Sequence, residues 1–254
     1  MSTSINRLMQ IYISKSLPIS DSELEARVAI IERHVNSYFE RVGRMPEGVL
    51  DIGSGSDLSL PLLMTKYAKS VVASDINRLA NDYLMNNILK RIGISSFEES
   101  GLKYVIYSPP IILFDDHSFD LITSTSVLEH VPKTQIGILA KEIYRLLKYD
   151  GVSTHHIAHK DHWSDSDPKI LSMNYLRHSE AEWKKYNPPL LYQNRLLSSY
   201  FTKIFADAGF QVGSSLTKKS PPDFAPADCF HGYEADDLSA THTWLTLRKR
   251  STDD

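Results

Sequence analysis

Residues 48–58 have the sequence Gly48-Val49-Leu50-Asp51-Ile52-Gly53-Ser54-Gly55-Ser56-Asp57-Leu58. An apolar run ends at an acid, two glycines follow two residues apart, and a polar residue precedes a second apolar run. This pattern predicts a buried strand that turns sharply into a helix. Glycines at such a turn let a ligand lie against the backbone, and the N–H groups at the start of the helix point towards it. We therefore expect a cofactor site at this turn.

The charges of the turn indicate which kind of cofactor it binds. A dinucleotide-binding turn would carry a third glycine at position 58, which here is Leu58. Asp51 and Asp57 bracket the loop and would repel a pyrophosphate, whereas they attract a ligand with sulfonium and ammonium groups. Asp57 is also a suitable N-cap for the following helix. The turn therefore favours a cationic cofactor and disfavours a nicotinamide-dependent oxidoreductase.

Composition limits the remaining classes of protein. The chain has 254 residues, 42% of them hydrophobic and 23% charged, which suits one full core with an insertion. A net charge of −3 provides no general basic field, which disfavours bulk nucleic-acid binding. Cys229 is the single cysteine, so no intrachain disulfide can form. No apolar run approaches the roughly 18 residues of a membrane helix, and no signal-peptide core is evident. We expect a cytoplasmic protein without a membrane span.

The rest of the chain alternates between helix and strand signals. Ser20 and Glu23 form a capping-box pattern, and apolar residues at steps of three and four predict a long helix that ends at Gly43. Residues 1–19 suggest a short amphipathic segment. Strand and helix then alternate five times, which predicts a parallel sheet with helices on both faces. Expected strands are 48–52, 70–75, 102–107, 119–124, 152–157, 210–216 and 241–248; expected helices are 59–68, 78–91, 136–146 and 198–208, with a loop over 217–240.

Several segments together resemble class I S-adenosylmethionine (SAM) dependent methyltransferases. They are the motif at 48–58, Asp115 to Ile122, Val127-Leu128-Glu129-His130-Val131 and Arg145 to Gly151, so the match covers about residues 48–157. Asp57 departs from the usual third glycine of the first motif, and Asp150 from the first glycine of a later pair. The resemblance implies an α/β, Rossmann-like seven-stranded sheet of order 3-2-1-4-5-7-6, in which strand 7 is antiparallel.

The resemblance also implies that the methyl donor is S-adenosyl-L-methionine. Asp75 ends the second strand, where its two acceptor oxygens suit the paired hydroxyls of a ribose. We expect His130 to shape the turn near the cofactor rather than to abstract a proton. The expected cofactor-binding residues are Asp51, Gly53, Ser54, Gly55, Asp75, Ile76, Ser124, Glu129 and His130.

The predicted organisation is a single methyltransferase domain with four parts. These are an N-terminal helix (20–47), a SAM-binding half (48–157), an insertion (158–194), and a C-terminal helix with strands (195–254). An insertion that leaves strand five should lie over the methyl donor, so we interpret 158–194 as an acceptor-binding lid. Its aromatic residues, including Trp163 and Trp183, could instead form the small core of the insertion.

Methyl transfer to a hydroxyl requires orientation and a base, and histidine is the side chain best suited by its pKa. In His159-Lys160-Asp161-His162 an acid lies beside two candidate bases. We predict His162 as the base, with His159 as second candidate and Asp161 as the neighbouring acid. The same cluster could bind a divalent metal, but its spacing matches no specific signature, so no metal site is predicted.

The acceptor is suggested by a weaker resemblance. The run from His156 to His162, with Asn174-Tyr175-Leu176-Arg177, Glu182-Trp183 and Asn194-Arg195-Leu196, is similar to methyltransferases of bacterial polysaccharide and secondary-metabolite clusters. It implies O-methylation of a sugar, glycan or small metabolite. The alternatives are an N-methyltransferase acting on a small molecule or a protein, and a SAM-binding protein without catalytic activity.

Overall fold

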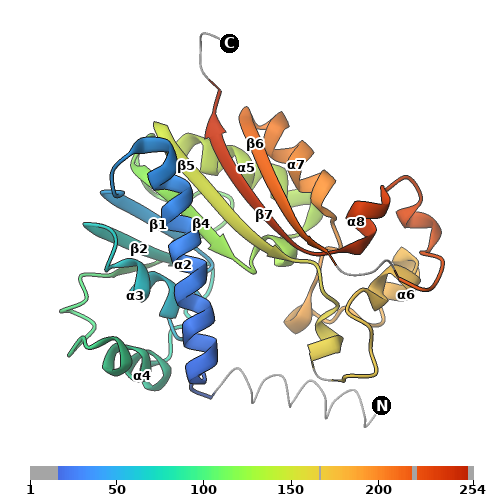
Figure 1. The fold of residues 1–254 in the computed structure, drawn as a ribbon, viewed down its shortest axis with the longest axis horizontal. Helices are drawn as coiled ribbons and strands as arrows, with labels where there is room; N and C mark the ends of the chain where they lie inside the picture. Colours follow the sequence, from blue (N-terminus) through green and yellow to red (C-terminus); the bar gives the residue numbers. More distant parts are fainter. Residues whose placement is uncertain (1–16, 166, 219–221, 251–254) are drawn as a thin grey trace.

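The computed structural model describes residues 17–165, 167–218 and 222–250 (Figure 1). The amphipathic segment expected over residues 1–19 therefore lies almost entirely outside the described residues. Within the described ranges, no helix combines the length and the apolar character needed to cross a bilayer.

Seven strands of the described chain form one sheet in the order β3-β2-β1-β4-β5-β7-β6. The first five strands in sequence run parallel, and β7 pairs antiparallel with both β5 and β6. The fold predicted from the sequence is confirmed. The strands are β1 Gly48–Ile52, β2 Ser70–Asp75, β3 Lys103–Ile106, β4 Phe119–Thr125, β5 Leu147–Ala158, β6 Phe210–Lys218 and β7 Ala240–Lys249.

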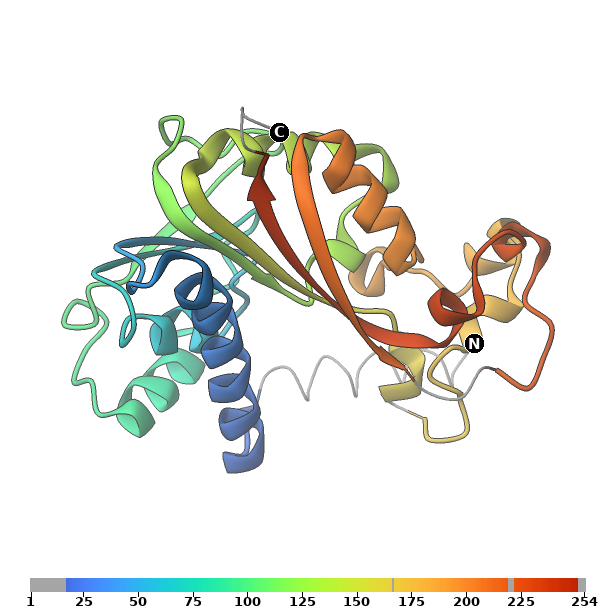
Figure 2. The same ribbon diagram turned by 45° about the horizontal axis from the view of Figure 1, so that its top comes forward.

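Helices cover both faces of this sheet (Figures 1 and 2). Successive strand residues point to opposite faces, so Val49 packs with α2 (Asp21–Val42), α3 (Ser59–Met64) and α4 (Asp82–Ile92), whereas Leu50 packs with α5 (Lys133–Leu146) and α7 (Ser198–Asp207). Leu121 and Ile122 of β4 divide in the same way. Both faces of the central strands are therefore buried, as expected for a parallel sheet between helical layers.

Capping residues next to each helix explain where several of the helices begin and end. The N-terminal helix begins as predicted, because Ser20 and Glu23 make both hydrogen bonds of the capping box, and Gly43 ends it at φ 74°. The helix expected from residue 78 begins instead at Asp82, because the Asn81 side chain accepts from the Leu84 N–H. The helix expected over 59–68 ends at Met64 and continues only as tight turns.

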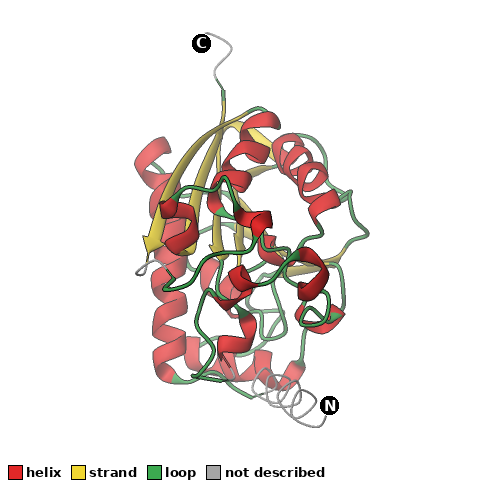
Figure 3. Ribbon diagram, turned by 90° about the vertical axis from the view of Figure 1, so that its right-hand side faces the viewer, coloured by secondary structure: helices red, strands yellow, loops and turns green. Residues whose placement is uncertain are grey.

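The segment after β5 folds into short helical turns rather than long elements. They are η2 His162–Asp165, η3 Asn174–Arg177, α6 Glu180–Trp183 and η4 Pro189–Leu191. Part of the predicted loop 217–240 also forms helix, as η5 Asp228–Phe230 and α8 Ala235–Ser239. The two segments lie side by side (Figures 1 and 3) and share a separate apolar cluster that contains Tyr175, Trp183 and Phe230.

Candidate functional site

The turns that follow β1, β2, β4 and β5 meet at one edge of the sheet. Ile52 at the end of β1 aligns with Ser74 of β2 and with Ser124 of β4, and Thr125 aligns with His156 of β5. Parallel strands end together at this edge, where ligands of open α/β sheets bind. The predicted cofactor and catalytic segments are therefore neighbours in space.

The two glycines of the loop after β1 have similar backbone angles but different surroundings. Gly53 has φ 75°, and a β-carbon added there would lie 2.4 Å from Cγ2 of Val127. Its N–H donates to the Ser74 carbonyl at 2.7 Å, which fixes the loop on β2. Gly55 has φ 73°, and within 4 Å an added β-carbon would meet no atom of the described residues other than its own chain neighbours. The loop thus leaves open space over Gly55, which fits a ligand lying on the backbone.

Asp75 ends β2 and points back at this loop. One carboxylate oxygen accepts from the Gly55 N–H at 3.3 Å and the other from the Asn77 N–H at 3.1 Å. A carboxylate has about four acceptor sites, so these two bonds leave capacity for the paired hydroxyls of a ribose. Ile76, the next residue, is 50% exposed at the rim of the same turn.

Asp51 is a buried acid near the end of β1, just before the loop. Its carboxylate accepts from the Thr123 hydroxyl at 2.8 Å, and the residue is only 4% exposed. Burial raises the pKa of Asp51 to about 6, and the charge of Asp75 adds to the rise. A cation bound nearby would favour the ionised form of this acid. Asp51 therefore fits a positively charged cofactor.

Asp57, by contrast, forms an ion pair with an arginine of the protein, Arg27. The Arg27 guanidinium of α2 lies 2.5 Å from its carboxylate and also donates to the Ser59 hydroxyl. Asp57 accepts from the Ser59 N–H at 3.0 Å, but the N-cap position belongs to Leu58, which has φ 51°. The N-cap prediction was therefore wrong by one residue. The charge of Asp57 is matched by Arg27, so of the two acids that bracket the loop we expect Asp51 to be the one that faces a bound cation.

Two other predicted cofactor residues have partners within the protein. The Ser124 hydroxyl lies 2.7 Å from Nδ1 of His155, and both side chains are buried. His155 also stacks on Phe205 of α7. The Ser54 hydroxyl donates to the backbone carbonyls of Asp51 and Ser74 and thereby helps to shape the loop.

The turn after β4 forms a short 3-10 helix, η1 (Leu128–His130). Glu129 accepts from the Ala158 N–H at the end of β5 at 3.2 Å. Nδ1 of His130 donates to the Tyr192 carbonyl at 2.7 Å. The Asn194 amide donates to the carbonyls of Leu128 and Val131, at 2.7 and 2.9 Å. The turn is thus held by β5 and by the chain that leaves the insertion.

His162, the predicted base, lies beside this turn. Its ring centroid is 4.8 Å from that of His130, with 35° between the ring planes. One carboxylate oxygen of Glu129 and one ring nitrogen of each histidine all lie within 4.8 Å of one another. We call Glu129, His130 and His162 the histidine cluster. It joins the turn after β4 to the turn after β5.

The other two predicted catalytic residues are directed elsewhere. Nε2 of His159 lies 2.7 Å from the Thr243 hydroxyl of β7, and burial lowers the pKa of His159 to about 4. Asp161 is fully buried and accepts from the Trp163 N–H at 2.9 Å and from the Asn174 amide at 3.4 Å. Burial raises the pKa of Asp161. The partners of His162 in the histidine cluster come instead from the Val-Leu-Glu-His motif, a signal that sequence reasoning had assigned to the cofactor.

A second hollow lies away from this edge. A surface groove of about 590 Å³ runs between α2 and the β6–β7 edge, with Arg33, Ser215 and Trp244 in its lining. Its lining residues come from α2, β6 and β7 rather than from the glycine loop. It is therefore separate from the convergent turns described above.

Comparison with known proteins agrees with this geometry. Residues 25–215 match a protein family described as "Methyltransferase domain". The chain belongs to this methyltransferase family. Its cofactor is S-adenosyl-L-methionine, as predicted. A search of curated proteins gives no match.

Solved structures share the class I SAM-dependent methyltransferase fold at low sequence identity. The YcgJ protein from Bacillus subtilis has a TM-score of 0.53 and 14% identity, over 89% of this chain and 100% of that one. A candidate methyltransferase solved with the Haloferax volcanii Trm112 methyltransferase activator has a TM-score of 0.51 and 17% identity, over 91% of this chain and 95% of that one. Phosphoethanolamine N-methyltransferase 2 from Haemonchus contortus, solved with S-adenosyl-L-methionine, has a TM-score of 0.53 and 16% identity. The match covers 87% of this chain and 53% of that one.

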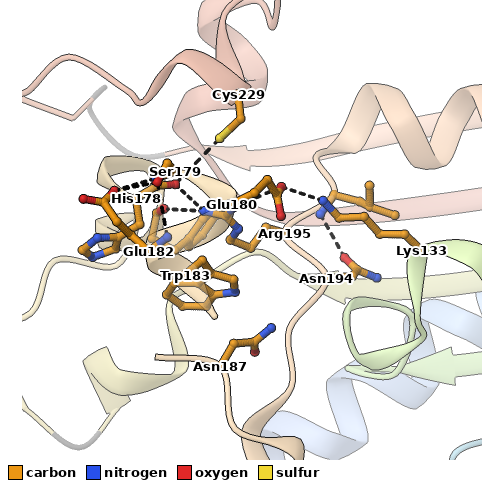
Figure 4. Close-up of polar contacts among 12 residues, drawn as sticks. Lys133, His178, Ser179, Glu180, Glu182, Trp183, Asn187, Asn194, Arg195 and Cys229 are labelled. Carbon is orange, nitrogen blue, oxygen red and sulfur yellow. Dashed lines mark hydrogen bonds and ion pairs between the residues drawn. The ribbon is translucent and has the colours of Figure 1, made fainter. Parts of the chain in front are cut away.

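In this methyltransferase the predicted lid is fastened to the sheet domain by a buried arginine (Figure 4). Arg195 donates to the carbonyls of Tyr175 and His178, at 3.1 and 2.6 Å, and lies 3.0 Å from Glu180. Glu180 also contacts Lys133 of α5 at 2.8 Å. The chain of contacts runs from inside the insertion to α5, the helix that follows η1.

Trp183 belongs to the core of the insertion in the methyltransferase. It is only 4% exposed, and the Arg195 guanidinium lies 5.2 Å from its ring centroid. Trp163 is half-buried, and its indole N–H donates to the Tyr186 carbonyl at 2.7 Å. The two tryptophans therefore differ, and only Trp163 has partial exposure at which an acceptor could make contact.

Proposed function

We propose that this methyltransferase moves a methyl group from S-adenosyl-L-methionine to a hydroxyl of a sugar, a glycan or a small metabolite. The observation that supports the proposal is the position of the histidine cluster at the same sheet edge as the loop of Gly53 and Gly55. The cofactor supplies a methyl group activated by a positive sulfur. The protein has to hold that group in line with the acceptor and to remove a proton.

Each task has candidate side chains at this edge. Asp75 binds the ribose hydroxyls, and Asp51 offsets the positive charge of the cofactor. His162 accepts the hydroxyl proton as the oxygen attacks, while His130 is held by Tyr192 and supports the ring of His162. His159 and Asp161 act as positioning residues, because their bonds to Thr243 and to the Trp163 N–H fix the backbone on either side of Lys160.

The acceptor class is supported by the resemblance of residues 156–196 to enzymes of polysaccharide and secondary-metabolite clusters, and by a base-like group at the site. An amine acceptor can lose its proton to solvent before it reacts, so it depends less on such a group. The phosphoethanolamine N-methyltransferase neighbour makes N-methylation the alternative to test. The cytoplasmic location expected from the composition remains part of the proposal.

The deciding experiment is a methyl-transfer screen with labelled S-adenosyl-L-methionine over sugars, sugar nucleotides, phenols and amines, with the products identified by mass spectrometry. We expect a methylated hydroxyl product with wild-type protein and little product with the Asp75→Ala variant. Transfer only to amines would replace the proposal by N-methylation. Tight cofactor binding without transfer to any acceptor would favour a SAM-binding protein without catalytic activity.

A further inference from the structure

The histidine cluster has the composition of a metal-binding site. Glu129 and His130 come from the turn after β4, and His162 comes from η2 after β5. The cluster brings together one carboxylate oxygen and two ring nitrogens, one per residue, all within 4.8 Å of one another. Two histidines and one carboxylate form a frequent ligand set for transition metals, with a further coordination position left for water or substrate.

Interactions around the cluster resemble those that support metal ligands. The Tyr192 carbonyl can only accept, so Nδ1 of His130 carries the hydrogen, and in the neutral ring the lone pair lies on Nε2. A backbone carbonyl in this role orients a ligating imidazole and selects its tautomer. The Ala158 N–H donates to one oxygen of Glu129 and orients the carboxylate. Both supporting groups belong to the backbone.

We propose that Glu129, His130 and His162 bind one divalent ion of the zinc or cobalt type. Ligand atoms at about 2.1 Å from a tetrahedral ion lie about 3.4 Å apart. The widest separation in the cluster therefore has to shorten by at most about 1.4 Å for all three atoms to bind one ion. Magnesium prefers ligand sets made of oxygen, so imidazole nitrogens select the zinc and cobalt class.

The ion affects the proposed function at one atom. It takes the nitrogen lone pair that His162 would offer to the acceptor proton, so a bound ion blocks the base. This consequence rests on the proposed function, whereas ion binding itself does not. We therefore expect excess zinc to suppress methyl transfer and a chelator to restore it.

The test is a titration with Co²⁺, whose visible absorption reports coordination without any need for activity. Wild-type protein should bind one equivalent with the absorption of a nitrogen- and oxygen-ligated ion. His162→Ala, His130→Ala and Glu129→Gln should each weaken binding by more than about tenfold. His231→Ala is the matched control, because the His231 side chain is 69% exposed and lies near Asp228 rather than in the cluster. Circular dichroism checks that each variant is folded.

The outcomes are distinguishable from those of the methyl-transfer screen. Absence of Co²⁺ binding, or binding that survives all three cluster substitutions, would overturn the metal site even if methyl transfer is found. Activation of transfer by zinc would overturn the blocking role. If no acceptor is found in the screen, the Co²⁺ titration still decides the metal site.

Discussion

Gly53 and Val127 touch so closely that a β-carbon on Gly53 would lie 2.4 Å from one Val127 methyl group and 2.8 Å from the other. This contact joins the loop after β1 to the turn that carries Glu129 and His130. Gly55 lies two residues further along the loop, and a β-carbon added there would have no atom of the described chain within 4 Å apart from its sequence neighbours. The first glycine therefore serves packing between two parts of the site, and the open space at the second is where we propose that the cofactor lies.

Alanine at the two glycines should accordingly have different effects. Gly53→Ala combines a clash with a left-handed backbone and should lower the free energy of unfolding by about 2–5 kcal/mol. Gly55→Ala should cost only about 1–2 kcal/mol from its backbone angle, yet weaken cofactor binding by more than about tenfold. Thermal unfolding and calorimetric titration with S-adenosyl-L-methionine measure the two effects.

A double variant provides the control. Adding Val127→Ala removes both methyl groups that Gly53→Ala would strike, so the pair should be more stable than the sum of the single effects predicts. Additive losses, or equal losses of cofactor affinity in both glycine variants, would contradict the division of roles.

Asp75→Ala should weaken cofactor affinity by about ten- to a hundredfold, because charge-assisted hydrogen bonds contribute about 1.5–3 kcal/mol. Asp75→Asn keeps one acceptor oxygen and should lose less. Glu25→Ala removes the same charge from an exposed position on α2 and should bind like wild type. Unchanged affinity of Asp75→Ala would show that the ribose is held elsewhere.

Asp51 should make cofactor binding depend on pH. Burial raises its pKa in the folded protein from 3.8 to about 6. The folded state therefore binds this proton more tightly than the unfolded state does. The resulting stabilisation of the fold is complete below about pH 4 and is lost as pH rises through about 6. A bound cation favours the ionised form. Binding should therefore release a proton and weaken as pH falls below about 6. Calorimetry at pH 5.5 in buffers of different ionisation enthalpy measures this release, and Asp51→Asn should abolish it. Equal affinity from pH 5 to 8 would contradict the prediction.

Local patterns predicted most element positions, because alternation along strands and caps at helix ends are readable over a few residues. The order of the strands in the sheet came instead from the resemblance to a known family. Contacts between distant segments were not readable in this way. The charge of Asp57 was assigned to a ligand, but Arg27, thirty residues earlier, lies against it. His159 was expected at the open edge, but its N–H donates to the Thr241 carbonyl and its ring contacts Thr243, so it continues the pairing with β7. The path of the chain, rather than the motif, decides where such side chains point.

The two tryptophans of the insertion should separate stability from acceptor binding. Trp183→Ala removes a buried ring and should cost about 3–5 kcal/mol, which lowers the melting temperature by about 10 °C. Trp163→Ala should be less destabilising and should raise the acceptor Michaelis constant while cofactor affinity stays near wild type. Melting curves and steady-state kinetics measure these effects. Equal melting temperatures for the two variants would contradict the assignment of Trp183 to the core.

Substitution of His162 should lower the turnover number, whereas substitution of His159 should mainly lower stability. His162→Ala should lower the turnover number by about 10²–10⁴, the usual contribution of a positioned base, with cofactor affinity retained. His162→Gln keeps much of the shape but cannot act as a base, so it should be nearly as impaired. His159→Ala should mainly lower stability, because the ring is 2% exposed, contacts Thr243 and has a pKa of about 4, too low for an effective proton acceptor near pH 7.

These assays need a chelator in every sample, so that no bound ion occupies the His162 nitrogen and lowers wild-type activity. The comparison is then between turnover numbers of folded variants at saturating cofactor and acceptor. Full turnover in both His162 variants would remove the base and leave orientation of the acceptor as the source of catalysis. A loss of turnover in His159→Ala equal to that in His162→Ala, with unchanged melting temperature, would instead return His159 to the reacting groups.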